Sequence, residues 1–294
     1  MNKLIIIGAG PAGLTAGIYA GRAQLQPLIF SGPNNGGQLV NTAMVENWPG
    51  AKDGILGPQL MLEMQAQAEK AGAKIISEAV KTVDFSQRPF RVNNDSAEAV
   101  IIATGAESIR LHIPGEDRLF GRGVAVCAVC DAPFYKDKIV AVLGGGDSAC
   151  EDAIALSKFA KKVYLIHRRD QLRASKIMAE RVKTNQKIEI LFNSQVTEIL
   201  GDNQVSGIKL NNQEIKVDGV FLALGHQPAT EIFKGKVEMD ESGYLKTFNN
   251  TMTSVRGVFA AGDCVDSRYR QAITAAGMGC QAALDAQKWL EEKR

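Results

Sequence analysis

The fold of this chain is decided by the stretch Leu4-Ile5-Ile6-Ile7-Gly8-Ala9-Gly10-Pro11-Ala12-Gly13. An apolar run that meets glycines at once is typical of a buried parallel strand turning into a helix. Gly8 permits the tight turn, Gly10 lets the backbone approach a pyrophosphate, and Gly13 lets the helix pack on the strand. We expect strands at residues 3–7 and 27–30 and a helix at 11–23, which form a βαβ dinucleotide-binding unit rather than a glycine-rich turn of another α/β protein.

One part of this fingerprint is missing. An acidic residue that binds a ribose hydroxyl is expected about 20 residues after the glycines, but Phe30-Ser31-Gly32 stands there. We therefore expect the ribose contacts to come from elsewhere, from Asn34 or from the backbone.

A second fingerprint, Gly144-Gly145-Gly146-Asp147-Ser148-Ala149, follows the apolar run 138–143 and opens a helix that reaches about residue 159. The next strand, at residues 162–166, ends in His167-Arg168-Arg169, with Arg173 one turn on. Arginine is always charged and binds phosphate through two donors, which suits a nucleotide 2'-phosphate. The second site is predicted to take NADP(H), the alternative being a solvated basic helix start.

A close pair of cysteines lies just ahead of the second fingerprint, in Cys127-Ala128-Val129-Cys130-Asp131. A zinc site would need two more ligands, and the other three cysteines stand alone in a chain with only three histidines. A structural disulfide that closes so short a loop contributes little. The spacing therefore favours a redox dithiol, in which Asp131 either moves a proton during disulfide exchange or caps a helix or turn.

Composition sets the remaining bounds. The 294 residues allow about two domains. A net charge of +2 gives no electrostatic case for nucleic acid or for a membrane surface. No apolar run reaches the roughly 20 residues that span a bilayer, and the first apolar run is too short for a signal peptide. An odd count of five cysteines argues against a secreted disulfide framework. The default expectation is a cytoplasmic protein that binds neither nucleic acid nor membrane.

The chain has no polar linker, and its two halves share strand-glycine-helix openings and strand-glycine endings. An amphipathic helix is expected at residues 61–71, a buried strand at 99–105 and a later strand at 219–224. A break is expected near residues 113–115. A short strand before Gly262-Asp263 and a helix at 272–290 complete the pattern. We predict an α/β fold with two Rossmann-like dinucleotide-binding domains.

Taken together, these residues resemble the low-molecular-weight thioredoxin reductases of the flavoprotein disulfide reductases, and the resemblance runs end to end. It is carried by both fingerprints, the dithiol and the basic His167-Arg168-Arg169. Family order is also kept by Gly36-Gly37-Gln38-Leu39, Glu46-Asn47-Trp48-Pro49-Gly50, Ala103-Thr104-Gly105, Gly225-His226, Ala260-Ala261-Gly262-Asp263 and Tyr269-Arg270-Gln271-Ala272-Ile273.

The resemblance implies a three-layer ββα architecture for each domain, with an NADPH domain inserted in an FAD domain. The expected parts are residues 1–114 for FAD, 115–244 for NADPH and the dithiol, and 245–294 for FAD. Hinges for a domain rotation are expected near 113–115 and 242–245. The resemblance also implies a homodimer and thioredoxin as the partner.

Residue roles follow from the resemblance and the fingerprints. Cys130 would lie against the flavin, Cys127 would exchange with thioredoxin, and Asp131 would be the general acid. The expected FAD contacts are Gly8, Gly10, Pro11, Ala12, Gly13, Gly37, Gln38, Asn47, Thr104, Gly105, Gly262, Asp263, Arg270, Gln271 and Ala272. The expected NADPH contacts are Gly144, Gly146, Asp147, Ser148, His167, Arg168, Arg169, Arg173 and Gly225. No metal is expected.

The chain departs from the family at Asp131-Ala132-Pro133-Phe134, where members usually have Asp-Gly-Phe-Phe. Pro133 is expected to stiffen the loop that carries the dithiol, and the sequence leaves open whether this narrows the choice of partner. The prediction is a thioredoxin-disulfide reductase with electrons passing from NADPH through FAD to Cys127–Cys130. The alternatives are a related NAD(P)H flavoprotein reductase of another thiol carrier and a non-catalytic redox sensor that binds nucleotides. A complete set of dithiol, acid and arginines argues against the sensor.

Overall fold

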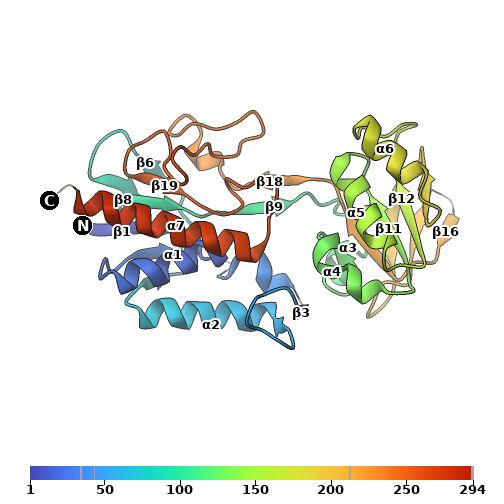
Figure 1. Cartoon of the computed structure of the whole chain (residues 1–294), viewed down its shortest axis with the longest axis horizontal. Coiled ribbons are helices and arrows are strands. Elements are labelled where there is room, and N and C mark those ends of the chain that lie inside the picture. Colours follow the sequence, from blue (N-terminus) through green and yellow to red (C-terminus); the bar gives the residue numbers. More distant parts are fainter. Residues whose placement is uncertain (34, 43, 212, 293–294) are drawn as a thin grey trace. The chain divides into compact units, whose positions relative to one another are not determined.

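The computed structural model describes residues 1–33, 35–42, 44–211 and 213–292. The chain forms two compact units, and Figure 1 labels many of their helices and strands. Unit 1 comprises Met1–Glu107 and Gln227–Arg294, and unit 2 comprises Ser108–His226. The inserted arrangement matches the expected α/β fold. The expected boundaries at 114/115 and 244/245 lie 7 and 18 residues after these divisions.

Unit 1 is built on a sheet in the order β5-β2-β1-β8-β7-β6, with β19 paired to β8. Strands β5, β2, β1, β8 and β19 are parallel neighbours, whereas β6, β7 and the start of β8 form an antiparallel meander. The strand bounds are β1 Asn2–Ile7, β2 Leu28–Phe30, β5 Lys74–Ile76, β6 Val83–Asp84, β7 Phe90–Val92, β8 Asp95–Ile102 and β19 Val258–Ala260. A separate hairpin pairs β3 Met44–Val45 with β4 Ile55–Leu56.

Alternate residues of the central strands divide the apolar core of unit 1 into two layers. Leu4 and Ile6 pack with helices α1 Pro11–Arg22, α2 Gly57–Lys70 and α7 Ala272–Glu291. Ile5 and Ile7 face the other way, toward residues of the meander and of the short helix η3 Glu231–Phe233. The 3-10 helix η1 Gly37–Asn41 lies beside α2. This gives the expected three-layer arrangement, with α1 and α7 side by side on one face (Figure 1).

Unit 2 repeats the plan with a parallel sheet in the order β10-β17-β11-β12-β13. Helix α5 packs on one face, and the antiparallel sheet β14-β15-β16 lies over the other. Its strands are β10 Val124–Ala125, β11 Ile139–Leu143, β12 Lys162–Ile166, β13 Ile188–Leu191, β14 Val196–Leu200, β15 Gly207–Leu210, β16 Gln213–Ile215 and β17 Gly219–Leu222. Its helices are α3 Glu116–Leu119, α4 Ala128–Asp131, η2 Ala132–Tyr135, α5 Asp147–Ser157 and α6 Lys176–Lys183.

The chain passes between the units twice, at β9 Ala106–Ser108 and β18 His226–Pro228, which pair with each other. Packing explains why these crossings lie before the expected boundaries. The fully buried Glu116 carboxylate accepts from the backbone N–H groups of Leu111 and Ile113 and pairs with Arg110 at 2.5 Å, which ties that segment to unit 2. Phe233 and Val237 are buried in the core of unit 1.

Of the helices in the described ranges, none has both the length and the apolar composition that crossing a bilayer requires.

Candidate active site and cofactor sites

The two predicted redox cysteines are joined in a disulfide, with 5.3 Å between their Cα atoms. Cys127 is the N-cap of α4, and its Sγ accepts a hydrogen bond from the Cys130 backbone N–H at 3.2 Å. Both cysteines are half-buried, while Val129 between them is 69% exposed. The pair therefore lies where a second protein can reach it, on a short helical turn that keeps both sulfurs together.

Asp131 follows the disulfide directly and is half-buried. Burial raises the pKa of its carboxyl to about 6, which lets it hold a proton close to neutral pH. Behind it, burial and then the charge of Asp131 raise the pKa of Tyr135 to about 12. Of the two sequence hypotheses for Asp131, proton transfer fits this environment, and its side chain makes no cap hydrogen bond to η2.

The first fingerprint folds as its glycines require. Gly8 has φ +112°, and a Cβ there would collide with the carbonyl oxygen of Ala103. A Cβ at Gly13 would collide with the carbonyl oxygen of Gly8, whereas the Cβ position of Gly10 faces open space. Pro11 and Ala12 form the first turn of α1. Gly37 comes close, since its Cβ would lie 3.2 Å from the Cα of Gly10, and Gln38 follows it in η1.

The other predicted FAD residues gather at the carboxyl ends of neighbouring parallel strands. Thr104-Gly105 follows β8 and Gly262-Asp263 follows β19, beside the end of β1. Among the described residues, Thr104 Oγ1 and Asp263 Oδ1 are buried without a hydrogen-bond partner. Burial, then the charge of Asp266, raises the pKa of Asp263 to about 6. Unpartnered buried polar atoms at a strand edge fit a ligand rich in hydroxyl groups.

The N-terminus of α7 brings in the remaining FAD candidates. Asn47 Nδ2 donates to Gln271 Oε1 at 3.2 Å. Gln271 caps α7 in a capping box with Thr274, and Ala272 is the first helical residue. Arg270 has φ +46°, and its backbone N–H donates to Asp266 at 3.1 Å. Asn34, suggested for a ribose contact, lies outside the described residues.

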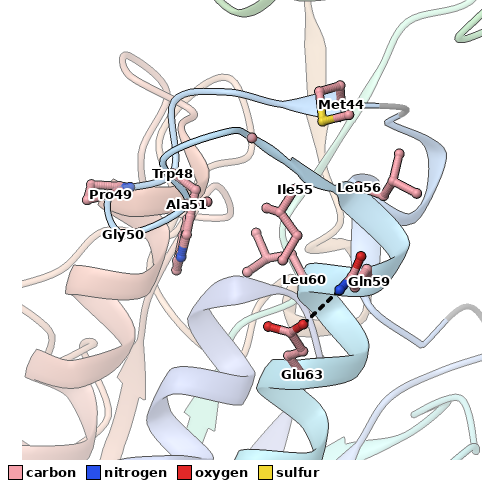
Figure 2. Close-up of a pocket in the computed structure, with 11 residues that line it drawn as sticks. Met44, Trp48, Pro49, Gly50, Ala51, Ile55, Leu56, Gln59, Leu60 and Glu63 are labelled. Atoms are coloured by element: carbon pink, nitrogen blue, oxygen red, sulfur yellow. Dashed lines mark hydrogen bonds between the residues drawn. The ribbon is translucent and has the colours of Figure 1, made fainter.

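A pocket of about 480 Å³ that the sequence reasoning did not single out lies beside Asn47, between the β3–β4 hairpin and the start of α2. Figure 2 shows Trp48, Ile55 and Leu60 lining it, and Gln59 donates to Glu63 at 3.0 Å. The full lining is Met44, Trp48, Pro49, Gly50, Ala51, Gly54, Ile55, Leu56, Gln59, Leu60 and Glu63. None of these residues belongs to the dithiol or to the glycine loops.

The second fingerprint forms a comparable loop in unit 2. A Cβ at Gly144 would collide with the carbonyl oxygen of Ala223, while the Cβ position of Gly146 is open. The His167 ring packs on Gly145, where it is 5% exposed. Burial, then the charges of Arg173 and Arg169, lowers the pKa of His167, which favours the neutral ring. The imidazole therefore packs against the glycine loop as part of the buried core.

The three predicted phosphate-binding arginines, Arg168, Arg169 and Arg173, are all exposed. In the described part of the chain their guanidinium groups form no ion pair and no hydrogen bond. Free, always-charged donors beside an open glycine loop fit a phosphorylated dinucleotide.

The other NADPH candidates differ in their surroundings. Asp147 uses its Oδ1 to accept from Ser175, at 2.8 Å from the backbone N–H and 2.9 Å from the hydroxyl. Ser148 is exposed at the start of α5. Gly225 has φ +105° and accepts from the Ile109 N–H at 3.0 Å. The sequence reasoning missed Ser175, although a serine before an amphipathic stretch is a signal for a helix N-cap.

The chain matches known proteins over nearly its full length. A family described as "Pyridine nucleotide-disulphide oxidoreductase" matches residues 2–279. The thioredoxin reductase of Streptomyces coelicolor is 50% identical and covers 99% of this chain and 94% of its own. The thioredoxin reductase of Mycolicibacterium smegmatis is also 50% identical, with coverages of 100% and 98%.

Solved structures agree. The thioredoxin reductase from Giardia duodenalis superposes with a TM-score of 0.92 at 45% identity, and that from Streptococcus pyogenes with 0.93 at 40%. Each comparison covers 98% of both chains. Together with the disulfide and the two dinucleotide folds, these matches confirm the family expected from the sequence. The chain belongs to the pyridine nucleotide-disulphide oxidoreductase family, and within it to the low-molecular-weight thioredoxin reductases, oxidoreductases that use FAD and NADPH.

Proposed function

We propose that this chain uses NADPH and FAD to reduce its Cys127–Cys130 disulfide and uses the resulting dithiol to reduce oxidised thioredoxin. The observation that carries the proposal is the half-exposed Cys127–Cys130 disulfide backed by Asp131, in a chain with two dinucleotide folds. When bound, the two cofactors supply the two electrons that reduce this disulfide.

The chain's own residues perform the exchange. With two electrons and two protons, Cys127–Cys130 becomes two thiols. The Cys127 thiolate attacks one sulfur of the thioredoxin disulfide, which forms a mixed disulfide and releases one thioredoxin thiolate. Cys130 then attacks Cys127, which restores the intramolecular disulfide and releases the second thiolate. Asp131, whose pKa of about 6 lets it hold a proton, protonates the departing sulfur.

For FAD, we propose the site formed by the first fingerprint and the strand ends of unit 1. The open backbone at Gly10, with Gly37 against it, would admit the pyrophosphate. Asp263 and Thr104, with buried oxygens that lack partners among the described residues, would bind hydroxyl groups of the ligand. Arg270, Gln271 and Ala272 at the start of α7 would face the ring system.

For NADPH, we propose the loop of Gly144 and Gly146 for the pyrophosphate and Arg168, Arg169 and Arg173 for the 2'-phosphate. Each charge-assisted hydrogen bond contributes about 1.5–3 kcal/mol, enough for at least tenfold preference over the unphosphorylated nucleotide. On this assignment, residues 108–226 are the NADPH-binding domain and the flanking parts are the FAD-binding domain.

We also propose that the protein is a cytoplasmic homodimer. Cys150, Cys264 and Cys280 are free thiols, as expected in a reducing compartment. Ile273 and Leu284 on α7 are 44% and 49% exposed, apolar surface that a second copy would cover.

An anaerobic visible spectrum tests the whole relay. Flavin absorbance should bleach when NADPH is added and return when oxidised thioredoxin follows. Bleaching without recovery would redirect the search to another disulfide partner. Cys127→Ser and Cys130→Ser should each abolish thioredoxin reduction and keep NADPH-dependent bleaching, while the control Cys280→Ser keeps both. Thioredoxin turnover retained in both active-site variants would refute the dithiol relay.

A further inference from the structure

The segment that joins β12 to α6, residues 168–175, carries all three proposed phosphate-binding arginines; we name it the arginine loop. It forms neither helix nor strand. Its three guanidinium groups are exposed and, among the described residues, unpaired. The loop also carries Asp170, but among the described residues no ion pair joins this acid to the three arginines, so other contacts must hold the loop.

The first end of the arginine loop is held by backbone hydrogen bonds. The Asn193 N–H donates to the Arg169 carbonyl at 3.0 Å, and the Ser194 N–H donates to the His167 carbonyl at 3.1 Å. Leu172, in the middle, packs against the apolar core of unit 2. These contacts fix where the loop leaves the sheet.

The second end is held against the glycine loop. The Arg173 N–H donates to the Gly145 carbonyl at 2.7 Å. Two residues on, Ser175 donates from both its backbone N–H and its hydroxyl to Asp147 Oδ1, at 2.8 and 2.9 Å. Asp147 follows Gly146 directly, so one carboxylate oxygen ties the arginine loop to the glycine loop.

Ser175 also begins α6. Its Oγ accepts from the Met178 N–H at 3.4 Å as the helix N-cap. One hydroxyl therefore joins three elements: the start of α6, the end of the arginine loop and the start of α5. Any residue except proline could supply the backbone N–H, but the Ser175 hydroxyl is needed to donate to Asp147 and accept from the Met178 N–H at the same time, and alanine can do neither.

We propose that Ser175, through Asp147, is a positioning residue that sets the preference of this enzyme for a 2'-phosphorylated nucleotide. The proposal rests on the proposed function, which assigns pyrophosphate to the glycine loop and the 2'-phosphate to the arginines. Those two groups belong to one ligand, so the two loops must stand at a fixed separation. With the loop backbone held in advance, only the arginine side chains are ordered when the phosphate binds, which lowers the entropic cost of binding.

The test measures equilibrium binding rather than turnover. Isothermal titration calorimetry gives the dissociation constants of NADP⁺ and NAD⁺ for the oxidised holoenzyme. Ser175→Ala should weaken NADP⁺ binding by about five- to tenfold and change NAD⁺ binding by less than about twofold, because one charge-assisted contact is lost and only the phosphate depends on it. Ser175→Thr, which keeps the hydroxyl, should keep the preference.

Thr184→Ala is the matched control. Thr184 lies at the other end of α6 and its hydroxyl donates to the Glu180 carbonyl at 2.9 Å, far along the helix from the arginine loop. Its loss should leave both affinities unchanged. Equal weakening of NADP⁺ and NAD⁺ in Ser175→Ala, or no weakening at all, would overturn the proposal.

A double variant separates this proposal from the assignment beneath it. Arg168→Ala with Arg169→Ala should reduce the preference for NADP⁺ at least tenfold, with Arg173 left as the remaining phosphate ligand. If it does so while Ser175→Ala keeps the preference, only the positioning role is wrong. If the double variant keeps the preference, the phosphate assignment fails and the positioning role fails with it.

Discussion

Two carboxyl groups, Asp131 in unit 2 and Asp263 in unit 1, have raised pKa values. Burial is the largest cause that raises the pKa of each to about 6. Neither has a salt bridge to offset this burial among the described residues. A buried carboxyl group with a raised pKa destabilises the folded protein at neutral pH. Its presence in both units therefore indicates a chemical role.

Burying the charged carboxylate of Asp131 lowers the free energy of unfolding. We therefore predict a pH-dependent gain in stability for Asp131→Asn. The folded pKa of about 6 lies above the ordinary value of 3.8 for an aspartate, so the folded state binds the proton more tightly. Wild-type stability then falls as pH rises from about 4 through about 6. The variant avoids this loss and should be more stable at pH 7–8 by about 1–3 kcal/mol, with the gain vanishing near pH 4. Urea unfolding at several pH values measures it, with the exposed Asp53→Asn as control. A gain that persists at pH 4 would contradict the cause given.

Asp263 supports a separate prediction about flavin. Asp263→Ala should weaken FAD binding by about tenfold or more, because a buried carboxylate that hydrogen-bonds the ligand is removed. Flavin content of the purified protein and FAD titration of the apoprotein measure the loss. NADP⁺ binding, which is proposed for unit 2, should be unchanged. If Asp263→Ala binds FAD with normal affinity, Asp263 does not contact the flavin cofactor.

At the level of secondary-structure elements, the close contact between helices α1 and α7 requires a glycine, which has no side chain. A Cβ at Gly279 of α7 would collide with the carbonyl oxygen of Ala12 in α1. Gly262, after β19, meets the same residue, since its Cβ would lie 2.9 Å from Ala12 Cβ. The first turn of α1, which carries the fingerprint, is therefore held in place by glycines from the far end of the chain.

Two glycines on α7 give a matched test of this contact. Gly279→Ala should destabilise the protein by about 2–3 kcal/mol and lower its flavin content, because backbone must move to admit the methyl group. Gly277→Ala, where a Cβ would meet no atom of its own chain within 4 Å, should leave the α1–α7 contact and the flavin content unchanged, although it shares the face of α7 proposed for a second copy. Thermal unfolding compares them. Equal effects at the two positions would show that the α1–α7 contact is not tight.

At the scale of the whole molecule, one unit interrupts the other. Unit 2 is a continuous stretch with apolar clusters on both faces of its sheet, so its core needs no residue from unit 1. Unit 1 is discontinuous, but β9 and β18 pair where the chain leaves and returns. The Ala229 N–H donates to the Gly105 carbonyl at 3.0 Å beside this crossing.

This organisation predicts that residues 108–226 fold alone. The fragment should unfold cooperatively, because each domain with its own core is an independent unit, and it should bind NADP⁺ without FAD. Joining Glu107 to Gln227 by a short glycine linker should give a complementary protein that binds FAD. Circular dichroism and calorimetry test the first, and flavin content tests the second. A fragment without a cooperative transition would mean that the units depend on each other.

Local sequence patterns predict the elements around the fingerprints correctly. The helix expected at 11–23 is α1 Pro11–Arg22, and the one expected at 272–290 is α7 Ala272–Glu291. Glycine spacing and apolar periodicity are local patterns, so they can be recognised from the sequence without knowledge of the fold. The helix expected at 61–71 begins earlier, at Gly57. Pro58 lies in its first turn, and a proline there is a sequence signal for a helix start that the prediction did not use. The dithiol was predicted for the same reason, since both cysteines lie on one turn.

Features that join residues far apart in the sequence follow from tertiary packing alone. The crossings lie at β9 and β18 because burial of Glu116 and Phe233 assigns the expected hinge segments to the units themselves. Asp147 bonds Ser175, 28 positions away, and Asn47 bonds Gln271, 224 positions away. The raised pKa of Asp263 likewise comes mainly from burial. Burial and long-range hydrogen bonds depend on which strands become neighbours, and local sequence patterns do not encode that choice.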